Sequence, residues 1–386
     1  MIKAIDIFSG CGGVSCGLTK AGFKVKAAVD NEKKAVKVYT SYQPLSKVKV
    51  LTEDVHKVSA HKLLRMSGLK EDDLYLFAGC PPCQNFSRQN TKNKEKTEEQ
   101  RKELLFEFLR LIEEIYPPFL LMENVQGITS KLNKPILEEF VGRLNNEENP
   151  LNKRYKVFAK VLNAANYGVP QTRMRFVLHA VRCDVYDELQ KANIPFDLPI
   201  ATHDKNKKND LLPWVTVSQA IGDLPAIKAG ESYTGNGIFN HKCAGLSSIN
   251  LERMRFIRAN GGSRTGLPER LVLKCHQKKD KNGNVFKGRN DVYGIMDADK
   301  PSPTITGGCL CYSKGRYGHY AQNRAISIRE AARLQTFPDD FEFTDNLSDA
   351  ALQIGNAVPI KLVEASGLVF IDTIKALQIE RKKQKK

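Results

Sequence analysis

Residues 79–87 read GCPPCQNFS and place Cys83 directly after two prolines. Proline fixes its own φ and restricts the residue before it, so the backbone that leads to Cys83 is stiff. The apolar run 74–78 just upstream predicts a buried strand. Open α/β sheets bind their ligands at the carboxyl ends of strands, and a thiol in that position suits nucleophilic attack.

Other uses of Cys83 have to be weighed against catalysis. Cys80 and Cys83 form a Cys-x-x-Cys pair, which is also compatible with a redox couple or with half of a zinc site. The remaining cysteines offer no second such pair and no closely spaced histidines, and two prolines would stiffen a redox loop. An inert buried cysteine is the third alternative, and we expect no metal.

The first 25 residues predict a strand and a glycine turn. Residues 4–8 alternate into a short strand, and SGCGG at 9–13 leads into a predicted helix over 14–21. Glycines allow the backbone to approach a ligand closely. The dinucleotide-binding pattern requires glycine where Ser15 stands, so that fingerprint matches only in part. A second strand over 23–29 ends in Asp30, where a carboxylate can bind ribose hydroxyls.

Two further segments carry polar groups next to predicted strands. Residues 118–125 form an apolar strand that ends with Glu123, which is either a solvated cap or a partly desolvated acid suited to proton donation. Residues 168–178 place Arg173 and Arg175 at alternate positions entering a strand, and therefore on one face. The alternative for this segment is an exposed basic edge strand.

Composition limits the class of protein. A chain of 386 residues with 41% hydrophobic and 27% charged residues is long enough for two globular domains. We expect no membrane span and no signal peptide, and nine scattered cysteines favour a reducing compartment. Sixty basic against 43 acidic residues leave a charge of +17, which favours a polyanionic partner, nucleic acid first.

Taken together, these segments resemble one family, the cytosine-C5 DNA methyltransferases. The resemblance covers the chain outside roughly 185–320 and rests on segments in family order: DIFSGCGG at 6–13, PPCQ at 81–84, ENV at 123–125, QTRMR at 171–175, REAARLQTFP at 329–338 and QIGNAVP at 353–359. It implies an α/β fold with a doubly wound, mostly parallel sheet of the Rossmann-like, S-adenosylmethionine-dependent type. A second, smaller target-recognition domain would accompany it.

The resemblance also implies a mechanism. Cys83 would attack C6 of a cytosine rotated out of duplex DNA, while protonated Glu123 would hydrogen-bond N3. Arg175 would hold O2, with Arg173 nearby to support the thiolate or a phosphate. The methyl donor would be S-adenosyl-L-methionine.

Cofactor residues carry over by position. Phe8, Ser9, Gly10, Gly12 and Gly13 match the turn around the methionine moiety, and Asp30 matches the ribose-binding acid. Asp54 and Val55 match the pair that recognises adenine, and Gly355 and Asn356 match a final element that folds back beside the first strand. Two positions depart from the family: Asn31 replaces an aromatic residue of some members, and Cys80 replaces a common glycine.

We expect a catalytic domain of 1–184 plus 325–386 and a target-recognition domain of 185–324. The candidate DNA contacts lie in the polar stretch after Asn85 and in the second domain; they are Ser87, Arg88, Gln89, Arg264, Lys287 and Arg289, each of which could hold phosphate or read a base.

The sequence shows no internal repeat, low-complexity linker or appended reader module, which favours a stand-alone enzyme of the bacterial restriction-modification type. We expect a monomer in the cytoplasm, nucleoid-associated if the source is bacterial, that acts on double-stranded DNA. A cognate restriction endonuclease for the same site is a candidate partner whose existence the sequence leaves open. Two alternatives stay open, a tRNA cytosine-C5 methyltransferase and a catalytically inert DNA-binding relative.

Overall fold

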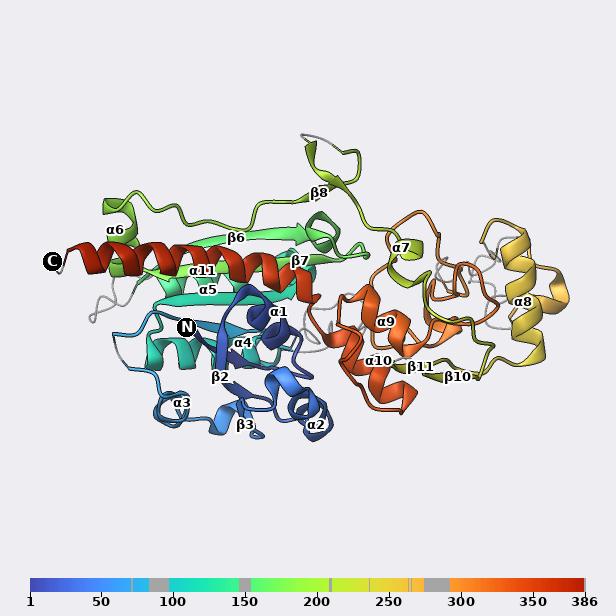
Figure 1. Ribbon diagram of the computed structural model, residues 1–386, viewed down its shortest axis with the longest axis horizontal. Helices are drawn as coiled ribbons and strands as arrows, with labels where there is room; N and C mark the ends of the chain where they lie inside the picture. The colour runs from blue at the N-terminus through green and yellow to red at the C-terminus, as the bar shows by residue number, and fades with distance from the viewer. Residues whose placement is uncertain are drawn as a thin grey trace. The chain divides into compact units, whose positions relative to one another are not determined.

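The computed structural model describes residues 1–70, 72–82, 97–145, 154–207, 210–235, 237–262, 264, 266–273 and 292–384 (Figure 1). The chain divides into two compact units. Unit 1 comprises Met1–Tyr167, Met174–Thr202 and Ala357–Lys386, and unit 2 comprises Gly168–Arg173 and His203–Asn356.

Unit 1 is built on a seven-stranded, mostly parallel sheet, as predicted. Its strand order is β3-β2-β1-β4-β5-β7-β6. The first five strands in this order run parallel, while β7 is antiparallel to both of its neighbours. The strands are β1 (Lys3–Ile7), β2 (Lys24–Val29), β3 (Lys49–Leu51), β4 (Tyr75–Gly79), β5 (Phe119–Val125), β6 (Tyr155–Asn163) and β7 (Met174–Arg182).

Helices cover both faces of this sheet. Those of unit 1 are α1 (Gly13–Ala21), α2 (Lys33–Ser41), α3 (Ala60–Ser67), α4 (Glu98–Ile115), α5 (Lys134–Asn145), α6 (Cys183–Lys191) and α11 (Ile360–Lys383), together with short 3-10 helices η1 (Gln43–Leu45), η2 (Val55–Lys57), η5 (Gln126–Thr129) and η6 (Ala164–Tyr167). Alternation along β1 separates the two layers, since Ile5 and Ile7 join the core that contains Phe108 of α4 while Asp6 bonds Ser15 of α1.

Close packing fixes the ends of the central strands. The ring of Phe108 stacks on Phe77 of β4 with centroids 5.5 Å apart, and a Cβ at Gly79 would lie 2.4 Å from the Phe108 ring. On the other face α1 lies against α11 (Figure 1), where a Cβ at Gly17 would meet Val363 at 2.5 Å. Glycine at these two positions therefore lets neighbouring elements approach closely.

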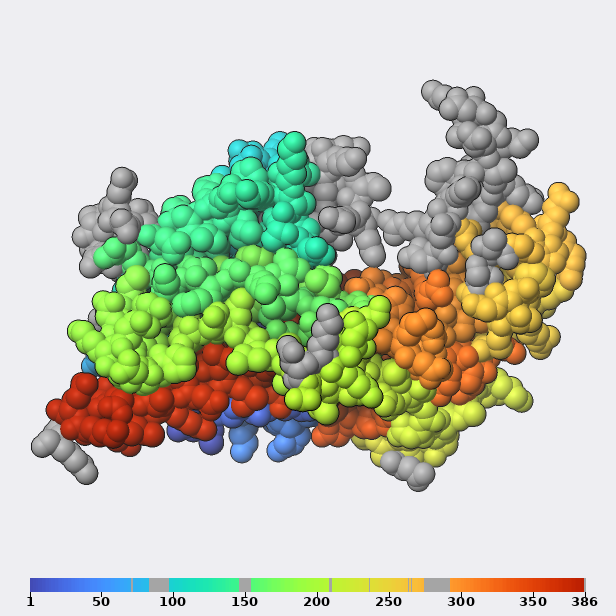
Figure 2. Space-filling view, turned by 90° about the horizontal axis from the view of Figure 1, so that it is seen from above, coloured from blue at the N-terminus to red at the C-terminus, as the bar shows by residue number. Residues whose placement is uncertain are grey.

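The C-terminal helix α11 belongs to the packing of unit 1. Arg381 near its end pairs with Glu188 of α6 at 2.7 Å, and the two elements are neighbours at the surface in Figure 2. A window within Leu347–Lys383 is long and apolar enough for a membrane span by length and composition, a stretch that the sequence did not lead us to expect. Because 61% of that window is buried inside the protein, it has the character of a core helix.

In unit 2 the described residues form short strands and helices joined by loops. It has a hairpin of β10 (Ser232–Gly235) and β11 (Ile238–Lys242), a short pair of β8 (His203–Asp204) and β9 (Leu212–Pro213), 3-10 helices η8 (Glu269–Leu271) and η10 (Tyr312–Lys314), and helices α7 (Val217–Ile221), α8 (Ser248–Ala259), α9 (Ile328–Leu334) and α10 (Leu347–Asn356). A small apolar cluster of Met254, Ile257, Ile295, Tyr312 and Ala325 packs α8 onto the loops that precede α9.

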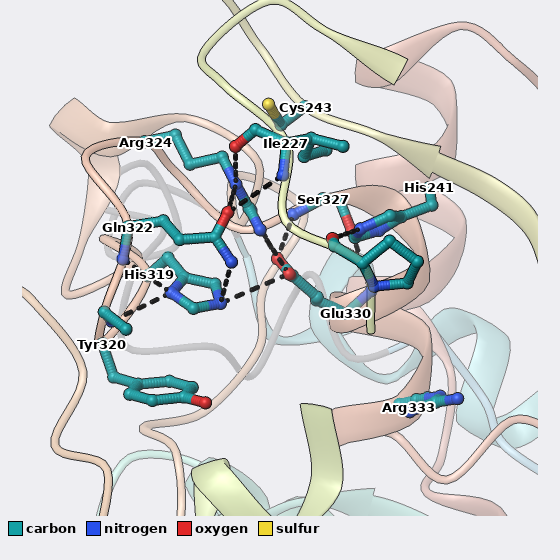
Figure 3. Close-up of polar contacts among 12 residues, drawn as sticks. Ile227, His241, Cys243, His319, Tyr320, Gln322, Arg324, Ser327, Glu330 and Arg333 are labelled. Carbon is teal, nitrogen blue, oxygen red and sulfur yellow. Dashed lines mark hydrogen bonds and ion pairs between the residues drawn. The ribbon is translucent and has the colours of Figure 1, made fainter. Parts of the chain in front are cut away.

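A buried polar network joins several loops of unit 2 to β11 and α9 (Figure 3). The guanidinium of Arg324 donates to both carboxylate oxygens of Glu330, at 2.7 and 2.6 Å, and all of these atoms are buried. His319 lies 3.4 Å from Glu330 and accepts from two backbone amides through Nδ1, so its proton sits on Nε2. His241 of β11 contacts Ser327 at the start of α9, which ties the hairpin to this network.

The division differs from the predicted domains at three places: Gly168–Arg173 belong to unit 2, residues 185–202 belong to unit 1, and unit 2 continues beyond residue 325. The sequence places the return to the first domain at residue 325, whereas residues up to Asn356 belong to unit 2. Long-range bonds explain the last of these differences, because Arg329 of α9 donates to the carbonyl of Phe239 in β11 of the hairpin. The assignment of unit 2 to DNA recognition stays a prediction.

Candidate active site

The glycine turn after β1 has the backbone geometry of a ligand-binding loop. Gly10 and Gly12 have φ values of +53° and +103°, and Phe8 adopts a φ of +61° although it carries a side chain. Left-handed non-glycine residues cost about 1–3 kcal/mol and cluster at functional sites. A Cβ at Gly10 would have open space around it, so the turn presents backbone to its surroundings at this point.

The turn is joined to the acid that ends β2. The amide of Gly10 donates to Oδ2 of Asp30 at 2.8 Å, and the amide of Glu32 donates to Oδ1 at 2.9 Å. Burial raises the pKa of Asp30, and the two amide bonds partly oppose that rise. The structure therefore brings the predicted residues of the turn and Asp30 together, with the carboxylate held in a fixed orientation.

Beneath the turn lies a buried chain of hydroxyls that sequence reasoning missed. Tyr39 of α2 donates to Ser15 of α1 at 2.7 Å, and Ser15 donates to Oδ2 of Asp6 at 2.6 Å. Within the described part of the chain, nothing hydrogen-bonds Oδ1 of Asp6. Burial raises the pKa of Asp6 to about 7. Ser15, which breaks the dinucleotide fingerprint, is thus the residue that donates to this carboxyl.

The predicted adenine-binding pair lies at the start of η2. The carboxylate of Asp54 caps this 3-10 helix by accepting from the amide of His56, while the side chain of Val55 is buried. His56 pairs with Asp54, and on the other side of its ring it pairs with Glu103 of α4. No signal in the sequence indicated Glu103, which is distant along the chain.

Gly355 and Asn356 end α10 and belong to unit 2. A Cβ at Gly355 would lie 2.1 Å from the carbonyl carbon of Thr306, so this position admits only glycine. Directly afterwards the chain enters unit 1, where the carbonyl of Val358 would lie 3.0 Å from a Cβ at Gly13. The chain thus returns beside the glycine turn through Val358.

The predicted catalytic acid and one arginine meet at the ends of β5 and β7. Nε of Arg175 lies 2.6 Å from Oε1 of Glu123, and both side chains are almost buried. Arg175 also donates from Nη1 to the carbonyl of Met174, which leaves Nη2 without a contact among the described residues. Next to Glu123, Asn124 donates to the carbonyl of Pro81 at 3.3 Å and so holds the segment that follows β4.

Cys83 itself lies outside the described residues, as do Ser87, Arg88, Gln89, Lys287 and Arg289. Of the candidate DNA contacts, Arg264 is described and follows α8 in a half-buried loop. Among the described residues no group of three or more His, Cys, Asp or Glu side chains could hold a metal ion.

Arg173 differs from its predicted placement. The strand β7 begins at Met174, so Arg173 precedes it and the same-face argument does not apply. Its buried guanidinium donates to the carbonyls of Ile305 and Gly355 within unit 2. These bonds make Arg173 a structural residue of that unit, and its contact with a thiolate or phosphate stays a prediction.

Comparison with known proteins identifies the family. The model of the C-5 cytosine-specific DNA methylases matches residues 2–370. Type II methylase M.HgiDII of Herpetosiphon aurantiacus is 32% identical over 96% of this chain and 94% of its own length. Type II methyltransferase M1.HphI of Haemophilus parahaemolyticus is 35% identical over 94% of this chain and 84% of its own length.

Solved structures agree on the fold. A protein assigned as a DNA modification methyltransferase encoded within an E. coli prophage has a TM-score of 0.68 at 23% identity, covering 97% of this chain and 100% of that one. The S. pombe Dnmt2 methyltransferase has a TM-score of 0.58 at 14% identity, covering 96% and 99%. With the glycine turn and the Glu123–Arg175 pair in place, the match over nearly the whole length shows that the chain belongs to the C-5 cytosine-specific DNA methylase family.

Proposed function

We propose that the protein transfers a methyl group to C5 of a cytosine within a short sequence of duplex DNA, as the modification enzyme of a type II restriction-modification system. The observation that carries this proposal is the pair of Glu123 and Arg175, 2.6 Å apart at the strand ends. The bond from Asn124 to Pro81 holds the chain that leads to Cys83 beside the same strand end.

The chemistry follows from the weakness of C5 as a nucleophile. The Cys83 thiolate attacks C6, and the electrons of the C5–C6 double bond move toward C5 and into the ring. Glu123 in its protonated form hydrogen-bonds N3 and stabilises that charge, while the unused Nη2 of Arg175 donates to O2. After methylation a base takes the proton from C5, the electrons of the C5–H bond restore the C5–C6 double bond, and the C6–S bond breaks so that Cys83 leaves as the thiolate.

The residues of unit 1 fit S-adenosylmethionine as the cofactor. Asp30 presents a carboxylate fixed by two backbone amides, and Asp54 has an oxygen, Oδ2, that no described residue contacts. Bound there, the cofactor supplies an electrophilic methyl group. Its holding residues in unit 1 would be Phe8, Ser9, Gly10, Gly12, Gly13, Asp30, Asp54 and Val55. The assignment of Gly355 and Asn356, which end α10 in unit 2, stays a prediction from the sequence.

Duplex DNA hides C6 of cytosine inside the base stack, so the base has to be rotated out at a cost of a few kcal/mol. We assign target recognition to unit 2. The excess of basic residues supplies the charge that a polyanion requires. The contacts would come from Arg264 and from residues outside the described ranges, namely Ser87, Arg88, Gln89, Lys287 and Arg289.

Action on genomic DNA would locate the protein in the cytoplasm, on the nucleoid if its source is bacterial. We expect a monomer, because each chain carries one complete set of catalytic residues. The type II methyltransferases to which it is similar also suggest a cognate restriction endonuclease that cuts the same site.

The first experiment is methylation of unmethylated plasmid DNA, read by base-resolution sequencing for 5-methylcytosine. Methylation at one short motif is expected, abolished by Cys83→Ser and kept by Cys80→Ser, the matched control at the neighbouring cysteine. An active Cys83→Ser variant would disprove the nucleophile. Methylation of RNA in preference to DNA would overturn the choice of substrate.

Glu123→Gln tests the acid separately from the nucleophile. The amide still fits the site beside Arg175 but carries no carboxyl proton, so the methylation rate should fall by about 10²–10⁴-fold. Cofactor binding should persist. Full activity of this variant would remove Glu123 from the mechanism.

A further inference from the structure

His56 links the predicted adenine site to the long helix α4. It follows Asp54 and Val55 directly, and its Nδ1 lies 2.6 Å from Oδ1 of Asp54. On the opposite side of the ring, Nε2 lies 3.2 Å from Oε1 of Glu103. The imidazole thus bridges two carboxylates, one on the cofactor side and one on α4.

Both contacts form fully only in the protonated ring. The neutral ring can carry the Nδ1–H that Oδ1 of Asp54 accepts, but the contact of Nε2 with Oε1 of Glu103 is an ion pair only when the imidazole is charged. The hydrogen bond to Asp54 raises the pKa of His56, and the charges of Asp54, Glu107 and Glu103 add to the rise. The same bond lowers the pKa of Asp54, with a smaller effect from the charge of Lys57.

The helix α4 holds η2 at a second point that does not titrate near neutrality. Arg110 donates from Nη2 to the carbonyls of Val55 and Val58, at 3.1 and 3.2 Å. Glu107 and Glu114 pair with the same guanidinium at 2.8 and 2.9 Å. The backbone of η2 therefore stays in place when His56 loses its proton, and the contact to Glu103 is the one that changes.

Two hydrogen bonds from His56 hold the carboxylate of Asp54 in one orientation. Its Oδ1 accepts from both the amide and the ring of His56, so the carboxylate is rotated with Oδ2 away from the imidazole. Oδ2 has no contact among the described residues. An exocyclic amino group that donates to Oδ2 would then find the acceptor oriented in advance, which reduces the entropy cost of binding.

We propose that His56 is a positioning residue for cofactor recognition: in its protonated form it bridges Asp54 to Glu103 and fixes the carboxylate that receives the adenine amino group. This inference rests on the proposed role of Asp54 in adenine binding. It also makes cofactor affinity depend on pH, strongest where His56 is protonated and weaker as the pH rises through its raised pKa.

The test is calorimetric binding of S-adenosylhomocysteine between pH 5.5 and 9, which reads affinity without turnover and without the sulfonium charge. His56→Ala should weaken binding about three- to fivefold at pH 6 and by less at pH 9, as expected for partly exposed ion pairs. Glu103→Gln should give part of this loss. His61→Ala, an exposed histidine on α3, is the matched control and should match wild type.

His56→Asn separates positioning from a general effect on folding. Its amide can donate to Asp54 but carries no charge, so the part of the pH dependence that comes from His56 should disappear while the contact to Asp54 is kept. Asp6 also titrates near neutrality in the same unit, and it is common to every variant, so the difference from wild type isolates His56.

The outcomes distinguish this inference from the proposed function. If Asp54→Asn weakens binding but His56→Ala matches wild type at every pH, His56 is a solvated surface residue and the inference is wrong. If Asp54→Asn itself binds normally, the assignment of Asp54 to adenine fails. A loss in His56→Ala that is equal at all pH values would also refute the role of protonation.

Discussion

Replacing Asp6 by asparagine should make unit 1 more stable at alkaline pH. Asp6 is fully buried in β1, and burial raises its pKa from 3.8 to about 7. A shift of about 3 pKa units corresponds to about 4 kcal/mol of differential stability between the protonated and ionised forms. Asparagine has nearly the same shape, accepts the bond from Ser15 and cannot ionise.

The sign follows from the order of the two pKa values. Below about pH 4 the carboxyl is protonated in both the folded and the unfolded chain, so it adds no dependence on pH. Between about pH 4 and pH 7 the unfolded chain loses this proton while the folded chain keeps it, and the stability of the wild type falls as pH rises. Above pH 7 the full difference of about 4 kcal/mol is reached.

The assay is urea unfolding by circular dichroism at pH values from 4 to 9, with hydrogen exchange of peptides from β1 and β4 to report on unit 1. The difference in unfolding free energy between Asp6→Asn and wild type should grow across the window and level off above it. A cost of about 1–3 kcal/mol from the unpaired amide would shift the whole curve but not its slope.

A second variant refines this prediction. The bond from Ser15 lowers the pKa of Asp6, so Ser15→Ala should move the upper end of the window to higher pH. A difference between Asp6→Asn and wild type that stays constant from pH 4 to pH 9 would show that Asp6 ionises normally in the folded protein. The account of a proton held beneath the glycine turn would then be wrong.

Three more predictions concern other parts of the chain. Burial would raise the pKa of Glu330, but the hydrogen bonds and charge of Arg324 outweigh burial and hold this pKa low. Glu330→Gln should therefore lower the free energy of unfolding by about 3–5 kcal/mol, because it leaves the buried charge of Arg324 unpaired. The measurement is thermal unfolding followed by the fluorescence of Trp214, the one tryptophan, and an unchanged melting curve would contradict the prediction. Gly355→Ala should unfold unit 2 at a lower temperature in the same assay, because its Cβ would overlap Thr306; a melting temperature equal to wild type would refute the close packing. The affinity for duplex DNA, measured by fluorescence anisotropy, should fall steeply between about 50 and 200 mM salt, with a flat response arguing against phosphate contacts.

Local patterns in the sequence were sufficient to predict the parallel sheet, the glycine turn and the acid at the end of β5. Each depends on residues close together in the chain: apolar runs for β1 and β4, glycines for the left-handed turn, and the position of Asp30 after β2. The buried hydrogen bonds of Asp6 were not predicted, because the sequence around an acid in an apolar strand does not show which residues it contacts in the fold. Its partners, Ser15 and Tyr39, come from two different helices.

Long-range contacts account for the other differences. Strand periodicity grouped Arg173 with Arg175, but Arg173 bonds carbonyls more than 130 residues away, at Ile305 and Gly355, and these bonds draw it out of β7. The expected domain boundary at residue 325 differs from the division into units for a related reason. Arg329, within a segment that resembles the family, donates to the carbonyl of Phe239 in β11, and no local pattern reveals such a partner.

The way the chain is shared between its two units limits how the protein can be recombined. Unit 2 is interrupted in sequence, since it takes the short arm Gly168–Arg173 as well as the long insertion His203–Asn356. Gln171 of the arm donates to the carbonyl of Leu334, and Arg173 donates to that of Gly355. A chimaera that exchanges only the long insertion would leave these donors behind, so an engineer who seeks a new methylation motif has to transplant the arm together with it.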